Sequence, residues 1–140
     1  MACAMFFAAV GVQFAVRQWP VTRIFLTSTA ATVLAMASLT LAIHAALVPA
    51  LIVSALLAGA GQGLGQLGGL TLIGLHVPDT HRAQSNAVLN IGGYIPAGLL
   101  PVATGYLIDA VGLATGATLF AVVLAIVALV GGAWAVQRLA

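Results

Sequence analysis

Four long stretches without a charged side chain constrain this chain more than any other feature. They cover residues 24–43, 45–75, 83–108 and 110–137, and each is bounded by Arg, His or Asp. A helix rises about 1.5 Å per residue, so roughly 20 residues cross a hydrocarbon core about 30 Å thick. Every stretch reaches that length, and residues 1–16 form a shorter fifth one. We therefore expect a membrane protein.

The apolar stretches are expected to be helices. Backbone groups in lipid must find hydrogen-bond partners within the protein, which an isolated strand cannot provide. We predict an all-α fold, a polytopic transmembrane bundle of about five helices in a single membrane domain, residues 1–140. The expected spans are 1–16, 24–43, 47–75, 83–108 and 113–137. Asp79 or Thr80 can cap the fourth helix by accepting a bond from its free N–H groups.

The composition excludes several classes of protein. Hydrophobic residues make up 63% of the chain and charged residues 4%, which lies far outside the range of soluble domains. The net charge of +2 comes with isolated arginines and no basic cluster, so no nucleic-acid partner is expected. Cys3 is the only cysteine, which excludes an intramolecular disulfide and any multi-cysteine metal site.

Constellations typical of soluble enzymes are missing from the sequence. His76, Asp79 and His81 fall in one short loop, but two His and one Asp without a further ligand make a weak metal site. Ser54 and Ser85 have no neighbouring base that would activate a hydroxyl as nucleophile. We therefore expect no catalytic residue, no metal and no cofactor, and a protein that is not an enzyme.

Glycines crowd the span 47–75. The pattern Gly63-x-Gly65-x-x-Gly68 has the form of a dinucleotide-binding fingerprint, but no strand precedes it and no acidic residue follows about 20 positions later. Glycines four apart instead let a second helix approach closely. We interpret them as packing positions, or as marks of a helix that slides or bends in a conformational cycle: Gly59, Gly61, Gly63, Gly65 and Gly69.

Two spans carry polar stripes at a spacing of four residues. Gln62 and Gln66 form one, and Asn86, Asn90 and Tyr94 form the other. An amide in lipid must find either another helix or a water-filled cavity, and the sequence leaves both alternatives open. These side chains are our candidate substrate pathway. The two polar spans are expected inside the bundle, and the oilier spans 24–43 and 113–137 outside.

The second polar span also contains Pro96 and Pro101, which remove backbone hydrogen bonds. We expect this helix to kink, and we count both prolines among the positions that serve conformational change.

The basic residues predict an orientation. When successive connections are placed on alternate sides of the membrane, every arginine falls on one side and Asp109 on the other. The positive-inside rule makes the arginine side cytoplasmic. We expect a multi-pass cell-membrane protein, and the abundance of Ala, Gly and Arg without Lys points to a bacterial inner membrane. The residues that set this topology are Arg17, Arg23, Arg82 and Arg138.

The order and spacing of these features resemble the C-terminal part of the major facilitator superfamily of transporters. The resemblance rests on Gly59-x-Gly61-x-Gly63, Pro78-Asp79-x-x-Arg82, Ser85-x-x-x-x-Asn90-x-Gly92-Gly93, Pro96, Pro101 and Gly105-Tyr106-Leu107-Ile108-Asp109-x-x-Gly112. It covers nearly the whole chain, which corresponds to about the last five of the family's twelve helices. The loop containing Arg17 and Arg23 departs from the family pattern because it lacks an acidic residue, so no charge-relay gate is expected there.

The resemblance implies a function. The helix with Gln62 and Gln66 would correspond to the family's tenth helix, which lines the central cavity, and the helix with Asn86, Asn90 and Tyr94 to the eleventh. We expect a fragment of a secondary active transporter that moves a small solute by alternating access. Its partners would be the lipid bilayer, a small-molecule substrate, and either the missing N-terminal helices or an oligomeric partner. The alternative is a small, non-transporting membrane scaffold or assembly subunit.

Overall fold

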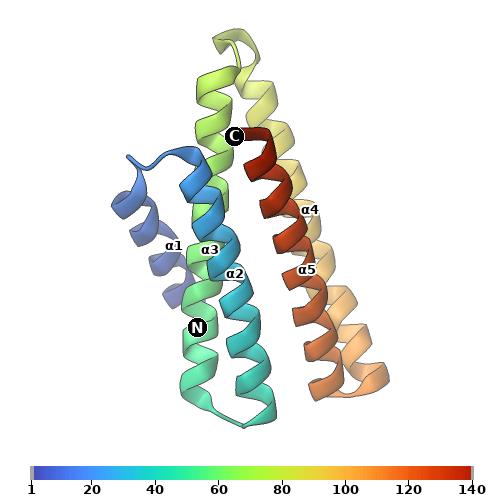
Figure 1. The fold of residues 1–140 in the computed structure, drawn as a ribbon. Coiled ribbons are helices and arrows are strands. Elements are labelled where there is room, and N and C mark those ends of the chain that lie inside the picture. Colours follow the sequence, from blue (N-terminus) through green and yellow to red (C-terminus); the bar gives the residue numbers. More distant parts are fainter. Residues whose placement is uncertain (1, 140) are drawn as a thin grey trace.

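The structure is a computed structural model that describes residues 2–139, and over this range the chain forms five α-helices and no strand (Figure 1). The helices are α1 (Ala2–Val16), α2 (Val21–His44), α3 (Val48–His76), α4 (Asp79–Val111) and α5 (Leu113–Leu139). Helices α2 to α5 are long and apolar enough to cross a membrane, while α1 is shorter. The all-α, multi-pass architecture is confirmed, and the helix ends lie within about one turn of the predicted ones.

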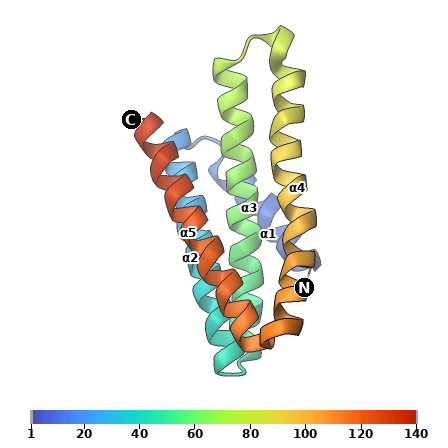
Figure 2. The same cartoon turned by 90° about the vertical axis from the view of Figure 1, so that its right-hand side faces the viewer.

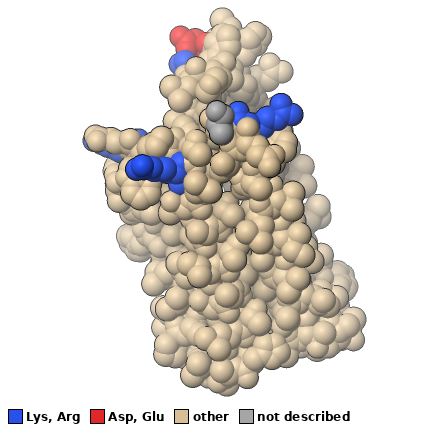
Figure 3. All heavy atoms as spheres, in the orientation of Figure 1, with Lys and Arg blue, Asp and Glu red and all other residues tan. Residues whose placement is uncertain are grey.

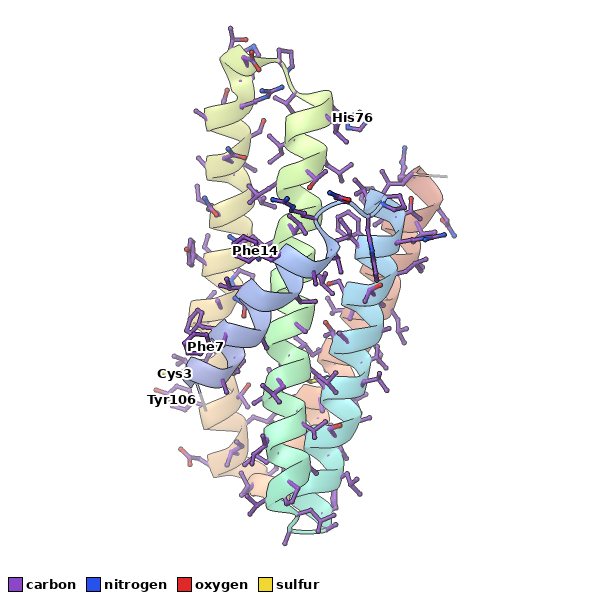
Figure 4. All side chains as sticks on the ribbon, turned by 90° about the vertical axis from the view of Figure 1, so that its left-hand side faces the viewer. Cys3, Phe7, Phe14, His76 and Tyr106 are labelled. Atoms are coloured by element: carbon purple, nitrogen blue, oxygen red, sulfur yellow. The ribbon has the colours of Figure 1, made fainter. Side chains whose placement is uncertain are left out.

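Helix α3 is the axis of the bundle. Helices α1 and α2 pack on different faces of α3, and α5 packs on α2 (Figures 1 and 2). Helix α1 crosses α3 obliquely (Figure 4). Because α3 has glycine where its neighbours cross, their backbones come close to its own. A Cβ atom built on Gly63 would lie 2.8 Å from Ala9 Cα of α1, and one on Gly61 would lie 3.3 Å from the Ser28 carbonyl oxygen of α2.

Small clusters of buried side chains fill the spaces between these helices. Val16, Ile24 and Leu64 bring the end of α1 together with α2 and α3. Ala35 and Met36 of α2 pack with Ala121 of α5. Ala35 and Ala121 are small, as is usual where helices associate within lipid and van der Waals contact replaces the hydrophobic effect.

Polar side chains add bonds between the same helices. Ser28 Oγ donates to the Gly61 carbonyl oxygen at 2.7 Å, and the buried Ser54 Oγ donates to the Ala35 carbonyl oxygen at 2.9 Å. Both hydroxyls are therefore satisfied inside the bundle, which lipid requires.

Helix α4 stands apart from the rest. None of its residues is buried. It packs on α5 towards the turn that joins the two helices, and it runs beside α3 with fewer contacts (Figure 2). The expectation that α4 lies inside the bundle and α2 outside is wrong among these five helices, because α2 contacts both α3 and α5. The polarity of a span indicates which side chains need polar surroundings, whereas close packing between these helices follows their small residues.

The start of α4 differs from the expectation, and its end shows how the chain turns into α5. Neither Asp79 nor Thr80 caps α4, because the residue preceding the helix is Pro78 and no side chain bonds to the first turn. Asp79 instead forms an ion pair with Arg82. Between α4 and α5 the chain turns at Gly112, whose φ of 86° and ψ of 159° are accessible to glycine and strained for other residues.

The arginines gather at one end of the molecule. Arg17 precedes α2, Arg82 follows the start of α4, and Arg138 stands at the end of α5, and Figure 3 shows the basic side chains of its visible face confined to this upper end. We call it the arginine end. Asp109 lies at the opposite end, where His44 and Thr118 are hydrogen-bonded at 2.9 Å.

Candidate functional site

A cleft of about 850 Å³ separates α3 from the middle of α4. Its volume lies in the range of small-molecule sites. The cleft is lined by Gln62, Gly65 and Gln66 of α3 and by Val88, Leu89, Asn90, Gly92, Gly93, Tyr94, Pro96, Ala97 and Leu100 of α4.

The cleft exists because α4 is held near its two ends. Towards the arginine end α4 approaches α3 at Gly69, where an added Cβ would lie 3.1 Å from a methyl carbon of Leu89. At the other end α4 packs on α5, and a Cβ on Gly116 would lie 3.0 Å from Ile108 Cα. Between these contacts glycines on both helices leave the space unfilled.

The structure brings four of the five candidate pathway residues to this cleft: Gln62, Gln66, Asn90 and Tyr94. All four side chains are exposed, and none takes part in a hydrogen bond among residues 2–139. The stripes that lay on two separate helices in the sequence therefore face a common space. Their amides and phenol can both donate and accept hydrogen bonds.

Asn86 is the candidate that does not line the cleft. It lies one turn from Asn90 towards the arginine end and is half-buried. Its side-chain oxygen is enclosed without a hydrogen-bond partner within the described chain. A buried, unpaired amide oxygen is costly in lipid, so this position also needs a polar partner.

The two prolines of α4 add backbone acceptors to the cleft. The helix runs continuously through Pro96 and Pro101, and neither proline has an N–H to give to the residue four positions earlier. The carbonyl oxygens of Gly92 and Ala97 therefore lack their usual helical donors, and both residues line the cleft. We missed these acceptors in the sequence, although a proline four residues after a cleft residue is the signal that reveals them.

The cleft lining contains no charged side chain. Hydrogen bonds and apolar contact are therefore its means of recognition. Within residues 2–139 no group of three His, Cys, Asp or Glu side chains comes together as a metal-binding set, and His76, Asp79 and His81 do not form one.

The glycines counted as packing positions are divided among three neighbours of α3. Gly59 and Gly63 face α1, where an added Cβ on Gly59 would lie 2.8 Å from Met5 Cα. Gly61 and Gly65 face Ser28 of α2. Gly69 faces Leu89 of α4. The glycines of α3 therefore lie at its contacts with α1, with α2 and with α4, which lines the cleft together with α3.

Of the four arginines, two have defined bonding partners. Arg82 donates to the carbonyl oxygens of Gly74 at 2.8 Å and Val77 at 3.1 Å, and it pairs with Asp79 at 2.5 Å. The Arg138 guanidinium lies 5.5 Å from the centre of the Trp134 ring, in a cation–π arrangement. Arg17 and Arg23 lie at the same end of the molecule.

Comparison of the chain with models of protein families, with curated proteins and with solved structures found no match.

Proposed function

We propose that this chain is part of a secondary active transporter of the major facilitator type, and that the cleft between α3 and α4 belongs to its substrate pathway. The observation that carries the proposal is the convergence of Gln62, Gln66, Asn90 and Tyr94 on one cleft without hydrogen-bond partners. The resemblance of the sequence to the C-terminal half of such transporters points the same way.

The depth of the cleft supports a pathway. Gln66 lies ten residues from the end of α3 at His76, which is about 15 Å along a helix and about half the thickness of a hydrocarbon core. Asn90 lies at a similar distance from the start of α4. Polar groups at this depth are expensive in lipid, and they are usual where a membrane protein encloses water or substrate.

The attachment of α4 supports a conformational cycle. A helix that is anchored at its ends, contains two prolines and has no buried residue can change its tilt at small cost in packing. Alternating access needs one group of helices to move against another around a fixed site. In the proposed transporter α4 would move and the packed group of α1, α2 and α3 would remain rigid.

The proposal includes orientation and partners. The arginine end would face the cytoplasm of a bacterial inner membrane, following the positive-inside rule. The exposed side of α4 would meet further helices of the same transporter or of an oligomeric partner, and these would close the cleft. The 140-residue chain in proteoliposomes is expected to show no uptake by itself.

Cysteine accessibility tests the aqueous pathway without knowledge of the substrate. Cys3 is the only cysteine of these 140 residues, so Cys3→Ala, with any cysteine outside them also replaced, gives a background for single cysteines at Gln66 and Asn90. A matched control is Val127→Cys in the middle of α5, which is also exposed on the bundle surface but lies away from the cleft. Native membranes are treated with a charged, membrane-impermeant thiol reagent, and labelling is measured by mass spectrometry.

A water-filled pathway predicts labelling at positions 66 and 90 and protection at position 127. Protection at all three positions would contradict the proposal. Labelling at all three would show only that the protein is unfolded or its membrane permeable, and would equally remove the support.

The uncovered surface of α4 favours the scaffold as a second candidate function. A non-transporting assembly subunit would bind another helix there, and the polar stripe would be satisfied by that helix rather than by water. Cysteines at positions 66 and 90 would then be protected from the reagent, and Asn90→Cys would cross-link to a partner in native membranes.

A further inference from the structure

A second, smaller cavity of about 400 Å³ lies at the arginine end, between the last turns of α3 and α5. Leu72, Ile73 and His76 line it from α3, Val77 from the residue that follows α3, and Arg138 and Leu139 from α5. It shares no residue with the cleft, and Arg82, which binds carbonyl oxygens at the end of α3, is not part of its lining. The cavity is therefore separate from the proposed substrate pathway.

The chemistry of the cavity is amphipathic. One wall carries the Arg138 guanidinium, and the remainder is largely aliphatic. Both flanking helices are membrane spans. Helix α3 ends here, and Arg138 follows the long uncharged run of α5, so the cavity lies at the level where hydrocarbon gives way to headgroups. A ligand that fits must carry negative charge at one end and an apolar body at the other.

Arg138 is held in place for such a ligand. Its guanidinium lies over the ring of Trp134, one turn nearer the middle of the membrane. A guanidinium held by a cation–π contact still has its N–H groups free to donate in the ring plane, and a phosphate diester accepts such bonds. No carboxylate pairs with Arg138 among residues 2–139, where Asp79 pairs with Arg82.

His76 completes the polar side of the cavity. Figure 4 shows it at the arginine end of α3, with its side chain pointing to the side on which α5 ends. Its Nδ1 lies 3.2 Å from the Leu72 carbonyl oxygen, so this nitrogen carries a hydrogen and donates. In the neutral ring Nε2 is then an acceptor, suited to a hydroxyl beside the phosphate.

We infer that the cavity binds the headgroup of an anionic phospholipid, with the phosphate on Arg138 and an acyl chain against Leu72, Ile73 and Leu139. Basic pockets between spans at a membrane surface are a recognised mode of lipid binding, and one positive charge near an anionic surface gives an enrichment of about fivefold. The site does not depend on the proposed transport function.

Trp134 provides the test, because its ring lies beside the Arg138 guanidinium and is exposed on the surface of α5. A Trp19→Phe background leaves Trp134 as the only tryptophan, since the chain has two. The 140-residue protein is reconstituted in phosphatidylcholine that contains a fixed small fraction of acyl-brominated lipid, either phosphatidylglycerol or phosphatidylcholine. Quenching of Trp134 fluorescence reports which lipid lies beside it.

The expected result is stronger quenching by brominated phosphatidylglycerol, equivalent to about fivefold preferential occupancy and reversed by unbrominated phosphatidylglycerol. Arg138→Gln should abolish the preference. Arg17→Gln, which removes an arginine at the same end but outside the cavity, should preserve it. Arg138→Lys, which keeps the charge, should keep part of the preference.

Three outcomes would overturn the inference. Equal quenching by the two brominated lipids in the wild type would show that the cavity has no preference for the anionic headgroup. Loss of the preference in Arg17→Gln as well as in Arg138→Gln would show that the general positive charge of this end, and not the cavity, attracts the anionic lipid. Relief of quenching by inorganic phosphate would identify a soluble anion as the ligand. Should Arg138→Gln fail to reconstitute, the wild-type comparison and the competition with unbrominated lipid decide the matter.

Discussion

The side-chain amide of Gln13 donates a hydrogen bond to the carbonyl oxygen of Gly63 over 3.0 Å and joins α1 to α3. The bond is possible because Gly63 has no side chain to separate the two backbones. An amide within an apolar helix is thus satisfied by close packing. Gln62, next to Gly63 in the sequence, lines the cleft and has no such bond. Of these two adjacent residues of α3, Gly63 therefore serves helix packing and Gln62 belongs to the candidate site.

Gly63→Ala is predicted to loosen α1 from α3. The added methyl would lie 2.8 Å from Ala9 Cα, a backbone atom that cannot move independently of its helix. We expect a loss of about 1–3 kcal/mol in the free energy of unfolding, the usual cost of overpacking. Titration of purified protein with a denaturing detergent, followed by circular dichroism, measures it.

Gly74→Ala is the matched control. It also lies in α3, and nothing is within 4 Å of its added methyl. It should leave the unfolding transition unchanged or raise it slightly, since alanine favours helix over glycine. Equal losses in both variants would show that glycine in α3 serves backbone flexibility and not close packing.

Ser54→Ala is predicted to weaken the contact between α3 and α2. The buried hydroxyl donates to the Ala35 carbonyl oxygen at 2.9 Å, and the substitution removes that bond with little change in volume. We expect a loss of about 1 kcal/mol, typical of a single hydrogen bond between helices in a membrane. The same detergent titration measures it.

Thr104→Ala serves as the comparison for Ser54→Ala. Its hydroxyl bonds to the Leu100 carbonyl oxygen of its own helix and is exposed. Its removal should change the unfolding free energy by much less. A Ser54→Ala variant as stable as Thr104→Ala would rule out the interhelical bond as a source of stability.

The membrane spans could be predicted from sequence because two local signals mark them. Uncharged runs long enough to cross a bilayer fix where helices lie, and residues such as Pro78 and Gly112 mark where they end. The spacing of Gln62 with Gln66, and of Asn90 with Tyr94, also fixed which side chains share a face. These properties depend on residues within a few turns of one another.

The arrangement of the helices could not be predicted in the same way. The sequence marks Gly59 and Gly61 alike as packing positions, yet the first faces α1 and the second α2. Which neighbour meets which glycine depends on the shapes of several helices at once. The same reason accounts for the position of α4. Its polar stripe indicated that these side chains need polar surroundings, but it did not indicate where α4 packs among the five helices.

Arg82→Gln is predicted to loosen the hairpin between α3 and α4. Arg82 donates to the carbonyl oxygens of Gly74 and Val77, which lie at the end of α3 where helical donors are missing. Faster hydrogen exchange of the backbone amides of residues 77–82, measured by mass spectrometry, is the expected result.

Asp79→Asn separates this effect from that of the ion pair. The Asp79 side chain is 84% exposed, and exposed ion pairs contribute little to stability. We expect exchange close to that of the wild type. If Asp79→Asn accelerated exchange as much as Arg82→Gln, the ion pair rather than the capping bonds would hold the hairpin.

Gly112→Ala is predicted to strain the turn between α4 and α5. Gly112 has a φ of 86°, and its N–H closes α4 by bonding to the Ile108 carbonyl oxygen at 2.8 Å. An alanine in this conformation costs about 1–3 kcal/mol, although nothing lies within 4 Å of the added methyl. Gly98→Ala, within α4 and equally open, should be neutral or stabilising because its backbone is helical. The two variants add the same atom at uncrowded sites, so a difference in their unfolding free energies reflects backbone conformation and not crowding. Equal stability would mean that the turn can adopt a second conformation, and the contact between Ile108 and Gly116 would then have to hold α4 against α5 without help from the turn.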